Sequence, residues 1–152
     1  MKPEIAKAVE LAYKVRKAAE RYQVLHSSNY DEDLRGLCGI ASMALVGYLR
    51  RNKIKASLIM GIIWEDDRRE RTLDPYEAGH CWVEVPINSK QNQVIDITMT
   101  QFKDCDKVYL ETIKAGGVAS RSRGYKNFRR WGSDRATPST TAKMLSLISE
   151  KE

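Results

Sequence analysis

Two neighbouring stretches of strand-forming residues near the middle of the chain constrain the fold most. They read HCWVEVPI, residues 80–87, and VIDITM, residues 94–99, and the short polar turn between them contains SKQNQ. A connection this short favours a hairpin of two antiparallel strands. Pro86 should limit or end the first strand, because proline donates no hydrogen bond to a sheet. The sequence therefore predicts an antiparallel sheet at the centre of the fold.

The segments before this hairpin have the periodicity of helices. Apolar residues recur every three or four positions over residues 3–24, and Pro3 suits a first helical turn. A second helix is predicted from about residue 38 to residue 52, with basic residues at its C-terminal end. Next, KASLIMGIIW predicts a buried strand, and the charged segment EDDRRERTLDPYEAG predicts a loop between strands. Two helices thus precede the sheet.

The segments after the hairpin complete the fold class. Residues 108–114 fit either a strand or a helix, and residues 138–150 predict a C-terminal helix. Helices, then an antiparallel sheet, then another helix is the order of an α+β fold. A length of 152 residues suits one domain, residues 1–152.

Positive charge is concentrated towards the C-terminus. The chain carries a net charge of +6, and the basic segment 121–135, RSRGYKNFRRWGSDR, holds much of the excess. This segment favours either a surface for an acidic partner or nucleic acid, or a solvated stretch whose aromatic residues pack on the core. No apolar run is long enough to span a membrane, so we expect no membrane contact. Three cysteines at unpatterned spacings argue for a reducing, cytoplasmic setting.

Cys38 is the candidate nucleophile. It falls at or just before the first turn of the second predicted helix, between Gly36 and Gly39. Free N–H groups and the positive end of the helix dipole lower the pKa of a thiol placed there. The Cys38 N–H would also point to where an oxyanion forms. This pattern is typical of a reactive thiol.

His80 and Asp96 are the candidate partners of this thiol. His80 opens the first strand of the hairpin, and Asp96 lies among apolar residues in the second. Cross-strand neighbours come within hydrogen-bonding reach, and an aspartate that fixes the tautomer of an imidazole completes a triad for acyl chemistry. The alternatives are that His80 is a core histidine and that Asp96 only caps a turn. Cys81 alternates to the opposite strand face and is expected to be a core residue.

In order and spacing, these motifs resemble those of one enzyme family. LCGIASMALVGYLRRNKIKASLIMG, GHCWVEV and VIDITMTQF are similar to the motifs of transglutaminase-like enzymes, a branch of the papain-like cysteine enzymes, over residues 34–102. The resemblance implies a papain/transglutaminase-like core in which the nucleophile-bearing helix packs on an antiparallel β-sheet. It assigns Cys38 as nucleophile, His80 as general base and acid, and Asp96 as the orienting carboxylate.

The resemblance also bears on the residues around the triad. Trp82 matches a tryptophan of the family and is expected to help bind substrate, whereas Cys81 stands where the family usually has alanine. A papain-like enzyme takes its second oxyanion donor from a side-chain amide upstream of the nucleophile. Asn29 and Gln101 are the candidate amides here.

The sequence favours a cysteine hydrolase, either a protease or peptidase or a deamidase, that acts on a peptide or protein. Transglutaminase or acyltransferase activity uses the same triad and stays open. A non-catalytic module that binds through the basic segment is a further alternative, as is a zinc-stabilised structural protein. A zinc site is not favoured, because the cysteines and histidines lack the spacing of zinc ligands. We expect neither a metal nor a cofactor.

Overall fold

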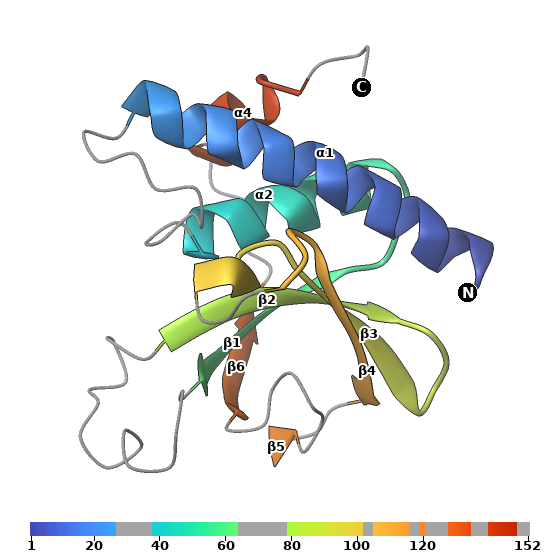
Figure 1. Cartoon of the computed structure of the whole chain (residues 1–152). Helices are drawn as coiled ribbons and strands as arrows, with labels where there is room; N and C mark the ends of the chain where they lie inside the picture. The colour runs from blue at the N-terminus through green and yellow to red at the C-terminus, as the bar shows by residue number, and fades with distance from the viewer. Residues whose placement is uncertain are drawn as a thin grey trace.

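The computed structural model describes residues 1–26, 38–63, 79–101, 105–115, 119–120, 128–134 and 140–148. In these ranges the chain is an α+β fold, as predicted (Figure 1). The elements follow in the order α1 (Pro3–His26), α2 (Cys38–Arg51), β1 (Ser57–Ile63), β2 (Gly79–Pro86), β3 (Gln91–Asp96), the short 3-10 helix η2 (Met99–Gln101), β4 (Tyr109–Lys114), β5 (Ala119–Ser120), β6 (Phe128–Asp134) and α4 (Thr140–Leu145).

The sheet has six strands in the described residues, in the order β4-β3-β2-β1-β6-β5, and every neighbouring pair is antiparallel. Helices α1, α2 and α4 gather on one face of it (Figure 1). Among these three, α2 makes the main contact with β1 and β2, whereas α1 and α4 pack on α2 and on each other. The predicted packing of the Cys38 helix on an antiparallel sheet is therefore confirmed. Within the described ranges, none of the helices is long and apolar enough to cross a membrane.

Two apolar clusters lie on the two faces of the sheet. The larger one joins the three helices to the side chains that alternate toward them, among them Leu58, Val83 and Ile95. The smaller one lies on the opposite face and contains Ile59, Trp82, Val94, Met99 and Ile113. The helix side therefore carries most of the apolar burial that stabilises the fold.

The predicted hairpin is present, but its second strand is shifted. The structure contradicts the prediction that SKQNQ is a turn, because β3 begins at Gln91. The Asn88 side chain closes the turn earlier, since its Oδ1 accepts the N–H of Lys90 at 2.8 Å and of Gln91 at 2.9 Å. The strand also ends at Asp96 rather than at Met99, because Asp96 Oδ1 accepts the Thr98 N–H at 2.9 Å and turns the chain.

The other sequence predictions have clear outcomes. The first two helices are confirmed, and β2 ends at Pro86 as expected. Residues 108–114 form a strand rather than a helix. The predicted helix 138–150 is shorter within the described residues, where α4 ends at Leu145. The N–H groups of Leu147 and Ile148 bond the carbonyls three residues back, at 3.1 Å each, which turns the chain out of the helix.

Candidate active site

Cys38 is the first residue of α2, and its side chain is half-buried. The N–H groups of a first helical turn have no acceptor within the helix, so this position favours a negative charge. At the same end of the helix, Ser42 Oγ donates to the main-chain oxygen of Cys81 on β2 at 3.0 Å. Cys38 and Ser42 are four residues apart and share one helix face. This hydrogen bond therefore holds the Cys38 end of α2 against the start of β2.

His80 and Asp96 are in direct contact. His80 Nε2 lies 2.6 Å from Asp96 Oδ2, and both side chains are completely buried. Because Val83 pairs with Ile95 in the β2–β3 ladder, Asp96 lies opposite Trp82 and diagonally across from His80. The predicted contact across the hairpin is confirmed. Because Nε2 is paired with the Asp96 carboxylate, Nδ1 is the ring nitrogen that can exchange a proton with the Cys38 thiol.

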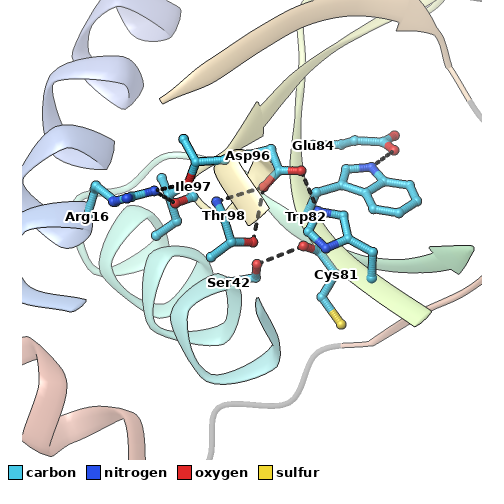
Figure 2. A network of polar contacts seen from close by, with 10 residues as sticks. Arg16, Ser42, Cys81, Trp82, Glu84, Asp96, Ile97 and Thr98 are labelled. Carbon is cyan, nitrogen blue, oxygen red and sulfur yellow. Dashed lines mark hydrogen bonds and ion pairs between the residues drawn. The ribbon is translucent and has the colours of Figure 1, made fainter. Parts of the chain in front are cut away.

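Asp96 is fixed by bonds to its own turn. Its Oδ1 accepts the Thr98 N–H at 2.9 Å and the Thr98 hydroxyl at 3.3 Å, while its Oδ2 faces the imidazole (Figure 2). The alternative that Asp96 only caps a turn is therefore wrong, because this carboxylate caps a turn and also binds His80. Because each carboxylate oxygen has its own hydrogen-bond partner, the Asp96 side chain is held in one orientation beside the imidazole of His80.

Arg16 braces this turn from the helix layer. It is 2% exposed on α1, and one of its Nη atoms donates to the Ile97 carbonyl at 2.7 Å and to Thr100 Oγ1 at 2.9 Å. Its Nε donates to Glu20 at 3.0 Å. Figure 2 shows the guanidinium reaching the segment that follows Asp96. This contact could not be predicted from the sequence, because only the packing of α1 brings residues so distant in sequence together.

Trp82 supports His80 from within the sheet. Its side chain is fully buried, and the His80 and Trp82 rings stack with centroids 5.9 Å apart. Trp82 Nε1 donates to the buried Glu84 carboxylate at 2.9 Å (Figure 2). Asn92 Nδ2 donates to the same carboxylate at 3.0 Å. The predicted substrate-binding role of Trp82 does not fit this placement, because no part of the side chain is exposed. Its place beside the imidazole indicates a supporting role.

The charges of Asp96 and Cys38 favour a protonated His80. Burial lowers the pKa of the ring, but the carboxylate of Asp96 and the sulfur of Cys38 outweigh it and raise that pKa to about 9. Attraction to the Asp96 charge is the largest of the raising causes, followed by the hydrogen bond to Asp96. Near neutral pH, His80 is therefore a cation that faces the thiol.

Cys38 is the complementary anion. The hydrogen bond from the Cys81 thiol is the largest cause that lowers its pKa, burial opposes this, and the hydrogen bond and charge of His80 lower it further, to about 4. The Cys81 thiol keeps its proton, because its pKa rises when it donates to the neighbouring Cys38 sulfur and is buried. We assign the charge to Cys38 because that residue has both the helix N-terminus and the imidazolium beside it.

Cys81 therefore has an influence on Cys38 that was not predicted from the sequence. Its predicted position on the strand face opposite His80 is confirmed, since it packs against the cluster on the helix side, but the residue is half-buried rather than a buried core residue. In addition, its thiol and main chain lower the pKa of the Cys38 thiol. The sequence offered one sign of this role: Cys81 follows His80 at a position where transglutaminase-like enzymes usually have alanine.

The remaining candidate residues are the two amides, Asn29 and Gln101, and the basic segment 121–135. Asn29 lies outside the described residues. Gln101 ends η2, where its main-chain N–H bonds the Thr98 carbonyl at 3.2 Å, and its Nε2 is buried with no acceptor among the described residues. Its role as an oxyanion donor stays a prediction. Most of the basic segment 121–135 also lies outside the described residues, except for residues 128–134, whose main chain forms β6.

Removal of the Arg16 brace should destabilise the protein. We expect Arg16→Met to lower the free energy of unfolding by about 2–3 kcal/mol, because buried acceptors lose a charged donor while most of the apolar volume is kept. Arg21→Met is the matched control on the same helix, since Arg21 donates to the Leu147 carbonyl at an exposed position. Urea unfolding measures both changes. Equal effects of the two substitutions would show that the bonds of Arg16 to Ile97 and Thr100 do not stabilise the fold.

Comparison of the chain with protein-family models, with curated proteins and with solved structures finds no match. The resemblance to transglutaminase-like enzymes therefore stays a prediction that depends on the motifs. The described residues contain no group of three or more His, Cys, Asp or Glu side chains that could hold a metal ion.

Proposed function

We propose that the protein is a cysteine-dependent hydrolase that cleaves an amide bond in a peptide or protein through a thioester intermediate. One observation carries the proposal: the buried His80–Asp96 pair, with an Nε2–Oδ2 distance of 2.6 Å, interacts with a half-buried thiol at the first residue of a helix. This arrangement supports an activated nucleophile, Cys38, that substrate can reach, with His80 beside it as the general acid and base.

The catalytic cycle follows from these charges. The Cys38 thiolate attacks the carbonyl carbon, and the Cys38 N–H helps to hold the oxyanion of the tetrahedral intermediate. His80 gives its proton to the leaving nitrogen, the C–N bond breaks, and a thioester remains. Neutral His80 then takes a proton from water, which attacks the thioester and releases the acid. Cys38 leaves as a thiolate, and His80 is again a cation.

The fold and the setting are part of the proposal. A helix that begins at the nucleophile and packs on an antiparallel sheet bearing His80 and Asp96 supports a papain/transglutaminase-like core. None of the three cysteines is in a disulfide, which supports a reducing compartment such as the cytoplasm.

Hydrolysis is favoured over acyl transfer because water is always available to resolve a thioester. A transferase would instead let an amine attack the same intermediate. Competition distinguishes the two. If a primary amine at millimolar concentration captures most of the acyl group, the protein is a transferase.

A screen of peptide p-nitroanilides, followed by mass analysis of the rapidly quenched reaction, tests the proposed function. We expect release of p-nitroaniline and an acyl adduct on Cys38. Cys105→Ala is the matched control, because Cys105 is a half-buried cysteine that packs against the smaller apolar cluster rather than at the start of α2. An adduct on Cys105 or Cys81 rather than on Cys38 would contradict the assignment.

The pH dependence of kcat/KM should be bell-shaped, with limits near pH 4 and pH 9. Below the lower limit the Cys38 thiolate is protonated and cannot attack. Above the upper limit His80 has lost the proton that the leaving nitrogen needs. Initial rates measured across this range check the prediction. A single rise near the ordinary thiol pKa of 9.0 would indicate a thiol that is not activated.

A further inference from the structure

The two thiols beside His80 form a pair that the proposed hydrolysis does not require. Ser42 Oγ holds the main-chain oxygen of Cys81 at 3.0 Å, one helical turn from Cys38 on the same face of α2. Figure 2 shows the Cys81 sulfur on the side of β2 away from Asp96 and Trp82, next to α2. In keeping with this placement, Cys81 is the largest of the causes that lower the pKa of the Cys38 thiol. Both residues are half-buried rather than sealed in the core.

We propose that Cys38 and Cys81 form a reversible disulfide when the protein meets a peroxide. The Cys38 thiolate first attacks one peroxide oxygen, so that the O–O bond breaks and Cys38 becomes a sulfenic acid. With hydrogen peroxide and one proton, the other oxygen leaves as water. The Cys81 sulfur then attacks the Cys38 sulfur, the S–O bond breaks, and a second water leaves with the Cys81 proton. In total the thiol pair loses two electrons and the peroxide is reduced.

The electrostatics of the pair favour this order of steps. Cys38 is the thiolate and therefore the sulfur that a peroxide oxidises first. Cys81 is held as a thiol by its hydrogen bond to the Cys38 sulfur, by burial and by the Cys38 charge. A sulfenic acid at Cys38 is neutral, so oxidation removes the charge that keeps Cys81 protonated. The second thiol thus becomes a better nucleophile at the moment when it is needed.

Two consequences follow. A disulfide blocks further oxidation of Cys38 to sulfinic acid, a step that is not reversed by simple thiols. It also removes the nucleophile, so that the hydrolase would be switched off under oxidation and restored by a dithiol. This second consequence rests on the proposed function, whereas the formation of the disulfide does not.

Peptide mass mapping after peroxide treatment tests the proposal on the full-length protein. Wild type and Cys105→Ala are each exposed to hydrogen peroxide, then blocked with iodoacetamide, with and without prior treatment with dithiothreitol. We expect a peptide pair joined through Cys38 and Cys81 in both proteins, loss of Cys38 alkylation, and full recovery after dithiothreitol. In Cys81→Ala, Cys38 should instead be oxidised to sulfinic acid, which dithiothreitol does not reduce.

The outcomes separate this proposal from the proposed function. Fast alkylation of Cys38 in untreated protein, together with sulfinic acid rather than a disulfide in treated wild type, would overturn the disulfide and leave the hydrolase standing. A Cys38–Cys81 disulfide in a protein that cleaves no amide would support the disulfide and overturn the hydrolase. A disulfide that includes Cys105 would overturn the assignment of the pair. The wild-type result alone decides the proposal if Cys81→Ala does not fold.

Discussion

Cys38→Ala is expected to lower kcat/KM for the best p-nitroanilide substrate by at least about 10⁴-fold. The proposed reaction proceeds through a thioester, and no other described residue combines a helix N-terminus with contact to a protonated imidazole. In the variant, His80 could still activate a water molecule, but this direct attack would not form the thioester that divides the reaction into two easier steps. The loss should appear in kcat, because the thiolate acts in the chemical step rather than in uniform binding of substrate.

Two controls make this result specific. Cys105→Ala should keep wild-type rates, since Cys105 is not part of the proposed mechanism. Thermal unfolding of Cys38→Ala should show a folded protein, because alanine fits a first helical turn. Retained activity in the folded Cys38→Ala protein would exclude the proposed nucleophile.

Asp96→Ala should have the largest effect on stability, a loss of about 3–5 kcal/mol in the free energy of unfolding. The substitution leaves His80 buried without the carboxylate that faces it at 2.6 Å. It also removes the acceptor that ends β3 at the Thr98 N–H. Because burial then acts on the ring without this opposing charge, the pKa of His80 should fall and the imidazole should become neutral.

Urea unfolding measures this effect, with Asp106→Ala as the matched control. Asp106 is an exposed acid outside the strands and should change stability by less than about 0.5 kcal/mol. The His80→Ala, Asp96→Ala double-mutant cycle isolates the pair, and its two single effects should be far from additive. Additive effects would mean that the two residues are not energetically coupled.

Local sequence patterns were sufficient to predict α1, α2 and the β2–β3 hairpin with its contact between His80 and Asp96, but they did not predict the strands β5 and β6. Periodicity predicted α1 and α2 because their apolar faces are continuous, and the short connection predicted the β2–β3 hairpin. The contact between His80 and Asp96 could be predicted because both residues are unusual in their strands and the hairpin limits their separation. The bounds of β3 were wrong because the Asn88 and Asp96 side chains bond the main chain and override strand propensity.

The rest of the site depends on contacts between distant segments. Arg16 lies 81 residues from Ile97 in sequence, and only the docking of α1 brings them together. Cys81 was expected to lie on the core face, which is correct, but strand alternation says nothing about which helix end meets that face. Its contact with Cys38 follows from the bond between Ser42 and the Cys81 carbonyl.

The pH dependence of Cys38 alkylation by iodoacetamide, in wild type and in His80→Ala, decides whether Cys38 is a thiolate paired with a protonated His80. We expect a wild-type midpoint near pH 4. In His80→Ala the midpoint should be higher, although still below the ordinary 9.0, because the hydrogen bond from Cys81 remains. A wild-type midpoint near 9.0, or one that His80→Ala does not move, would exclude this ion pair.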